Sequence, residues 1–293
     1  MSPPMSRRTF LLAGGSALAV AACSGSSKPA STTTPTTTRP AWNLVGFYSA
    51  DALAAGTNIR LPYGLAGADG GFPASLPVNA LTFTVTDPSG KAIPIPAPVP
   101  AHAENLPRAY FPLEFNAPTA GVYTVKSELQ GTALEASVQI GTGGTVPKTG
   151  DPMIPFDTPT TADLRGVQLL CTNSPACPLH DVTLTQALAE QRPLAFLIAT
   201  PKYCQVAVCG PVLDNLLAVK NDFPTVRFLH SEVYPSDAAA QPNVLQVVPV
   251  VTAYNLSFEP VLFLAGADGK VRTRLDSIFD TNELRTALAT ITS

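Results

Sequence analysis

The sequence predicts two folded domains, an all-β sandwich over residues 42–143 and an α/β domain over residues 166–293, joined by a linker over residues 144–165. Two observations predict this class. In the first region, short stretches of period-two alternation are separated by Pro, Gly and Asn clusters, with no helical segment. After the Gly- and Pro-rich linker, helical and strand patterns alternate. At 293 residues and 45% apolar composition, the chain is long enough for each domain to bury its own core.

Five short strands are expected in the first domain, each bounded by turn-forming residues. They cover residues 58–61, 81–86, 110–115, 121–125 and 136–140. The segment Ala120–Val125, AGVYTV, resembles the late strand of an immunoglobulin-like domain, which implies a fold and no particular function. We expect Gly64–Phe72 to be a long connection, because it lacks the flanking strand and helix of a phosphate-binding loop.

In the second domain, residues 194–199 are continuously apolar, as in a strand buried on both faces. Apolar residues then recur at helical spacing, for example at Val212 and Leu216. The expected helices cover residues 181–190, 211–220 and 282–291, and the expected strands cover residues 194–199, 226–230, 261–264 and 271–275. Strand, helix, strand, hairpin and helix together predict an α/β layer.

The N-terminal segment predicts export and a lipid anchor. Ser6–Leu11, SRRTFL, is a twin-arginine pattern, and the apolar run after it is too short to span a bilayer. Val20–Cys23, VAAC, resembles a bacterial lipoprotein cleavage box, which implies a signal peptide over residues 1–22 and a lipid on Cys23. Residues 23–41, rich in Ser, Thr and Pro, are expected to form a tether. We therefore expect the protein on the extracytoplasmic face of the cell membrane, where disulfides persist.

The charge of the chain excludes one class of partner. Its formal net charge is −3, and it has no polybasic patch. We therefore expect no nucleic-acid partner, and no contact with the membrane beyond the lipid on Cys23.

Two cysteines, Cys204 and Cys209, lie where the strand over residues 194–199 gives way to the helix over residues 211–220. Backbone N–H groups at the start of a helix lower the pKa of a nearby thiol, so this position favours a thiolate. Residues five apart in a regular helix point about 140° away from each other. A disulfide between the two cysteines therefore needs Cys204 in the turn before the helix.

The region from Leu194 to Ser293 resembles the thioredoxin fold. The resemblance rests on an aromatic residue before the first cysteine (Tyr203), on Pro211 in the following helix, and on the segment Glu259–Leu264, EPVLFL, with its hairpin and closing helix. It implies a cis-proline at Pro260 opposite the reactive cysteine.

The resemblance implies a role for one segment, and position and charge suggest roles for the cysteines and for Lys202. The backbone around Glu259 and Pro260 would hold an extended substrate segment. Cys204 would be the attacking sulfur and Cys209 the resolving one. Lys202 would favour the Cys204 thiolate by its charge.

The sequence departs from the thioredoxin pattern at three functional positions. Four residues rather than two separate the cysteines, Ile198 stands where the family keeps a buried Asp, and Tyr203 replaces the family's Trp. For Cys204 and Cys209 three interpretations stay open: a redox-active dithiol, which we favour, a structural disulfide, and a metal-thiolate site. A copper-delivery protein of this fold would use the two cysteines with a distant histidine, and His230 is the candidate.

A second pair, Cys171 and Cys177, flanks a Ser174-Pro175 turn, and we expect it to form a structural disulfide. The alternative is a metal half-site in which Cys177 and His180 supply two ligands and Cys171 a third.

The function we expect is thiol–disulfide exchange on extracytoplasmic protein thiols or disulfides, with no cofactor and no metal. The alternatives are a non-catalytic binding or scaffold lipoprotein with structural disulfides, and a copper-binding or copper-delivery protein.

Overall fold

The computed structural model describes residues 41–292 except residues 97 and 145. The predictions for the signal peptide, for the lipid on Cys23 and for nearly all of the tether lie outside the described residues. The described residues belong to one compact unit of the chain. In the part of the chain that the structure describes, no helix has both the length and the apolar character needed to cross a bilayer.

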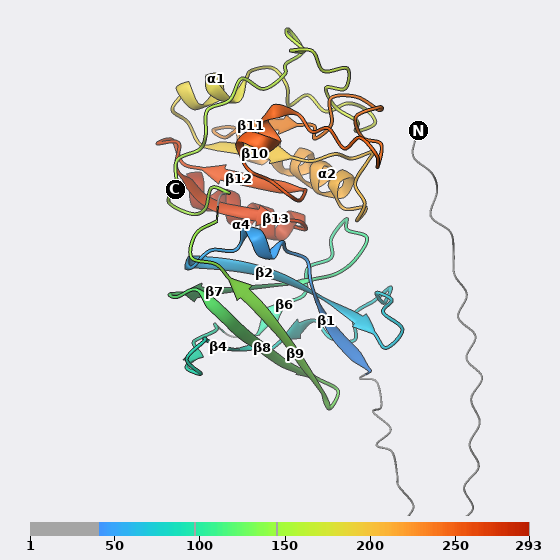
Figure 1. Ribbon diagram of the computed structural model, residues 1–293, viewed down its shortest axis with the longest axis vertical. Helices are drawn as coiled ribbons and strands as arrows, with labels where there is room; N and C mark the ends of the chain where they lie inside the picture. The colour runs from blue at the N-terminus through green and yellow to red at the C-terminus, as the bar shows by residue number, and fades with distance from the viewer. Residues whose placement is uncertain (1–40, 97, 145, 293) are drawn as a thin grey trace, which may run out of the picture. The chain divides into compact units, whose positions relative to one another are not determined.

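The first half of this unit consists of antiparallel sheets (Figure 1). One sheet has the order β1-β2-β7, with β1 at Trp42–Gly46, β2 at Gly56–Gly67 and β7 at Phe111–Ala117. The other has the order β5-β4-β8-β9, with β5 at Ala92–Ile93, β4 at Thr84–Thr86, β8 at Gly121–Leu129 and β9 at Thr132–Ile140. A short pair, β3 at Ala80–Leu81 and β6 at Val99–Pro100, accompanies them. A single apolar core contains residues of both sheets, so this part is a β-sandwich.

The expected connection over Gly64–Phe72 is wrong in its first half, because Gly64 to Gly67 belong to strand β2. Pro62 and the glycines suggest a turn, yet β2 pairs with both β1 and β7 and is buried along most of its length. A Cβ atom on Gly64 would lie 2.4 Å from the Phe47 ring. The glycine is therefore needed for close packing inside a strand rather than for a turn.

The second half contains one mixed sheet with the order β11-β10-β12-β13 (Figure 1). These strands are β10 at Leu194–Ile198, β11 at Arg227–Ser231, β12 at Val261–Ala265 and β13 at Val271–Asp276. Strand β10 is parallel to β11 and antiparallel to β12, and β12 and β13 form a hairpin. The expected strands over these four segments are confirmed within one or two residues at each end.

Helices cover both faces of this sheet. Successive side chains of β10 point to opposite faces, so they pack into two different cores. Phe196 and Ile198 join a core with α1 (Leu184–Ala189) and α3 (Pro249–Ala253). Ala195 and Leu197 join a core with α2 (Cys209–Val219) and α4 (Thr281–Thr292). The sequence predicts α1, α2 and α4 but not α3, which is five residues long and too short to show a helical period.

Candidate functional site

Cys204 and Cys209 lie at the two ends of a short turn between strand β10 and helix α2. Cys204 is half-buried in the loop, whereas Cys209 is fully buried as the first residue of α2. Ala207 adopts the left-handed conformation with a φ of 57°, and its N–H lies 3.4 Å from the Cys204 carbonyl oxygen. This fold-back lets the Cys209 N–H donate to Cys204 Sγ at 3.3 Å. The four-residue spacing is therefore accommodated before the helix, as the sequence required.

The two thiols differ in their affinity for a proton. The Cys204 pKa is lowered to about 6, chiefly because its sulfur accepts a hydrogen bond from the Cys209 thiol, and burial opposes this effect. Backbone N–H groups of Cys209, Val208 and Val206 lower it further. Burial, followed by the hydrogen bond to Cys204, raises the pKa of Cys209. The half-exposed sulfur is thus the thiolate at neutral pH, and the buried one keeps its proton.

Lys202 and Tyr203, expected to support Cys204, both contact Asp237. The Lys202 ammonium forms an exposed ion pair with the Asp237 carboxylate at 3.0 Å. The Tyr203 hydroxyl donates to the same carboxylate, and its ring packs edge-on against Tyr234. These contacts hold the start of the loop in place. The Lys202 charge is paired with Asp237 and not with the Cys204 sulfur.

The segment before strand β12 places Glu259 and Pro260 at the site. The Glu259–Pro260 peptide bond is cis, and Pro260 is buried with its carbonyl oxygen accepting the Ser277 N–H at 2.8 Å. The Glu259 pKa is raised to about 7, first by burial and then by the negative charges of Cys204 and Glu232. Only a backbone role was expected for Glu259, because nothing in the local pattern shows that its side chain is half-buried and close enough to Cys204 to feel its charge.

A pocket of about 360 Å³ opens beside the loop, with lining residues from both halves of the unit. Val206, Val208 and Glu259 line it from the α/β half, and Phe47 and Arg108 from the sandwich. The Arg108 guanidinium donates to the Val206 carbonyl oxygen at 3.0 Å, and its carbon lies 4.9 Å from the centre of the Phe72 ring. No local pattern points to Arg108, because its bond to Val206 joins residues 98 positions apart in the chain.

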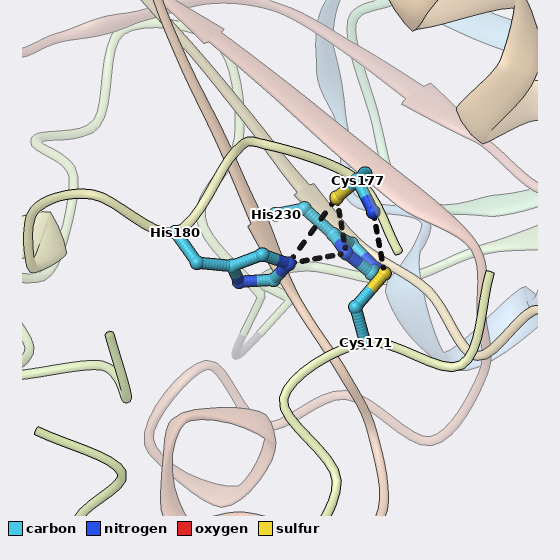
Figure 2. Close-up of side chains that lie close together, drawn as sticks. All are labelled: Cys171, Cys177, His180 and His230. Carbon is cyan, nitrogen blue, oxygen red and sulfur yellow. Dashed lines mark hydrogen bonds between the residues drawn. The ribbon is translucent and has the colours of Figure 1, made fainter. Parts of the chain in front are cut away.

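The second cysteine pair is part of a tight cluster with two histidines. Cys171, Cys177, His180 and His230 each point a donor atom at a common centre, and these atoms all lie within 4.8 Å of one another (Figure 2). All four cysteines named here are free thiols in the structure, so Cys171 and Cys177 are close neighbours rather than a formed disulfide. His230, on β11, lies with this pair and contacts Cys177, whereas the copper-site alternative had named it as a partner of Cys204 and Cys209.

Comparison with known proteins gives little help. No family model matches the chain. No curated protein matches it either. Among solved structures, it is similar to the Lin-41 filamin domain at 16% identity, over 36% of this chain and 97% of that chain, with a TM-score of 0.26. A likeness of this size carries no functional argument.

Proposed function

We propose that this protein is a membrane-anchored thiol–disulfide oxidoreductase that acts outside the cytoplasm through Cys204 and Cys209. The observation that carries the proposal is the asymmetry of the pair. A half-exposed sulfur with a pKa of about 6 accepts the N–H of a fully buried cysteine at the start of a helix. An accessible thiolate attacks, and a buried partner resolves the intermediate only after the first bond has formed.

The reaction follows from these two sulfurs. The Cys204 thiolate attacks one sulfur of a substrate disulfide, forming a mixed disulfide and releasing the other substrate sulfur as a thiolate. Cys209 then loses its proton and attacks Cys204 Sγ, which releases the second substrate thiolate and leaves a 204–209 disulfide. The substrate gains two electrons and the protein loses two. The reverse sequence oxidises a substrate dithiol.

Glu259 is the acid–base group that we assign to this step. Its carboxyl and both thiols influence one another's charge, and with a pKa of about 7 it exchanges a proton near neutral pH. In this proposal Glu259 replaces the buried Asp of the thioredoxin family as the proton-exchanging group. The family's position for that Asp is taken here by Ile198, an apolar residue buried in the core. In this proposal Glu259 accepts the proton that Cys209 must release.

The fold supports the proposal through its topology. A parallel β10-α2-β11 unit followed by the β12–β13 hairpin and helix α4 is the arrangement expected of a thioredoxin-like domain. In the sandwich, the Tyr123 hydroxyl donates to the Thr119 carbonyl oxygen at 2.8 Å, which is the contact of a tyrosine corner in immunoglobulin-like domains. We propose a thioredoxin-like domain behind an immunoglobulin-like sandwich.

We propose that the substrate chain lies in the pocket beside the Cys204 loop. An extended segment that passes Pro260 enters a space lined by Phe47, Arg108 and Val208. Aromatic rings and the stem of an arginine offer apolar contact area, and the guanidinium offers a donor for a backbone carbonyl. We infer that the sandwich supplies one wall of the substrate site.

Trapping of the mixed disulfide tests the proposal. In a Cys209→Ser variant the resolving step is blocked, so a disulfide-containing protein substrate should remain bound to Cys204 and be detected by mass spectrometry. Cys204→Ser should trap nothing and have no activity in reducing or oxidising a protein substrate. Thr185→Ala, at an exposed position on helix α1, is the control and should leave turnover intact.

The main rival is a scaffold lipoprotein whose cysteines are structural. It predicts a 204–209 reduction potential below about −300 mV, the range of structural disulfides, together with no turnover on any disulfide substrate. That combination would overturn the enzyme proposal.

A further inference from the structure

Four metal-binding side chains converge in the second half of the chain, and none of them belongs to the proposed redox pair. Cys171, Cys177 and His180 come from the loop before helix α1, and His230 comes from strand β11. We propose that these four residues form a closed tetrahedral site for a thiophilic d¹⁰ metal ion, with Zn²⁺ as its occupant.

The separations of the donor atoms fit such an ion. Cys177 Sγ lies 3.2 Å from His180 Nε2 and 3.4 Å from His230 Nδ1, and the two nitrogens are 3.3 Å apart. Bond lengths of about 2.0 Å to nitrogen and about 2.3 Å to sulfur place tetrahedral ligands about 3.3–3.8 Å from each other. Figure 2 shows the side chains directed at one centre from two separate segments. Three of the four ligands thus already stand at nearly the spacing that zinc needs.

The surroundings orient His230 as a ligand. Its Nε2 lies 3.1 Å from the Ala199 carbonyl oxygen. A neutral imidazole that donates its Nε2 proton to this carbonyl has a free lone pair on Nδ1, which is the atom facing the cluster. The His230 backbone N–H also donates to the Leu179 carbonyl oxygen at 3.0 Å, which ties the strand to the loop beside His180.

A buried carboxylate positions the remaining ligand. The Glu232 carboxylate accepts the Thr172 backbone N–H at 2.8 Å and the Thr172 hydroxyl at 2.7 Å. Thr172 follows Cys171 in the chain, so these bonds hold Cys171 next to the other three donors. Contacts around the ligands help to fix the geometry of metal sites.

Burial and ligand type indicate a structural zinc site. Cys177, His180 and His230 are 7%, 2% and 2% exposed, which leaves little access for a water or a substrate. Two thiolates and two imidazoles in a closed set are the ligands of structural zinc, whereas catalytic zinc keeps one position open. The ion would fasten the loop over residues 171–180 to strand β11. Because zinc binds thiolates, it and a 171–177 disulfide exclude each other.

Metal titration of the reduced, metal-free full-length chain tests the site. We expect one equivalent of Zn²⁺ to bind and to raise the melting temperature, because the ion stabilises only the folded chain. Co²⁺ in its place should give the visible absorption bands of tetrahedral thiolate coordination. Cys177→Ser and His230→Ala should each weaken Zn²⁺ binding by more than about 10-fold.

Controls separate this site from the other thiols and from misfolding. The double variant Cys204→Ser/Cys209→Ser and the variant His102→Asn should still bind one Zn²⁺. Cys171→Ser removes a half-buried ligand. Circular dichroism should show that this variant is folded, and the titration should show that it no longer binds Zn²⁺ tightly. The proposal is overturned by an absence of stoichiometric Zn²⁺, by binding of Cu⁺ but not Zn²⁺, by unchanged binding in Cys177→Ser, or by a 171–177 disulfide in the exported protein.

Discussion

At the scale of single residues, Glu259 is close enough to the two cysteines for its charge and theirs to shift one another's pKa. Burial raises its pKa from 4.5 to about 7 in the folded chain, so folding favours the protonated form. The stability that a protonated Glu259 allows is complete below pH 4.5 and is lost as the pH rises through about 7. A neutral side chain at position 259 should therefore increase the stability of the folded chain most at high pH.

Glu259→Gln should make the chain more stable relative to the wild type at pH 8 than at pH 5, measured by urea unfolding at both values. It should also lower the Cys204 pKa, because the nearby negative charge opposes the thiolate. Glu128→Gln, at an exposed strand position, is the control and should change neither quantity. An equal effect of Glu259→Gln at both pH values would show that its carboxyl is not buried.

At the scale of elements, helix α1 begins with a complete capping box. The Thr183 hydroxyl accepts the Gln186 N–H at 3.1 Å, and the Gln186 side chain accepts the Thr183 N–H at 2.9 Å. Thr183→Ala should destabilise the chain by about 1 kcal/mol in urea unfolding. Thr185→Ala, on the exposed side of the same helix, should cost far less, and similar losses for both would contradict the role of the cap.

Local pattern was sufficient for most elements of the α/β half. The continuous apolar run of β10 and the helically spaced leucines of α2 are visible in the sequence itself, so the pattern predicts both elements. It misses α3, which is a single turn or so, and it misses β1, whose residues alternate only weakly. Cys204 and Cys209 could be located as strand-end and helix-start residues. Arg108 and the joining of His230 to Cys177 could not, because they depend on contacts between distant segments.

At the scale of the whole molecule, a buried ion pair links strand β2 to helix α4. Arg60 Nε lies 2.5 Å from Glu283 Oε1, and Arg60 also donates to the Asp276 carbonyl oxygen at 2.9 Å. The Tyr110 hydroxyl donates to the same Glu283 carboxylate. The sequence predicted two domains with separate cores, and these contacts add a polar connection between them that no local pattern reveals.

Arg60→Met should destabilise the chain by about 3–5 kcal/mol, because it leaves the Glu283 charge buried without its partner. Arg60→Met/Glu283→Gln should recover part of this loss, since the uncompensated charge is gone. Lys126→Met breaks the exposed pair with Glu135 and should cost less than about 1 kcal/mol. Urea unfolding measures all three, and an equally small cost for Arg60→Met would mean that the pair does not join the two halves.

The pH dependence of Cys204 alkylation in the reduced chain tests the central claim most directly. With rates assigned to each cysteine by mass spectrometry, Cys204 should react with a midpoint near pH 6, and buried Cys209 should stay unmodified while the chain is folded. A Cys204 midpoint at or above the ordinary thiol value of about 8.5, or faster reaction at Cys209, would contradict an activated thiolate at this site.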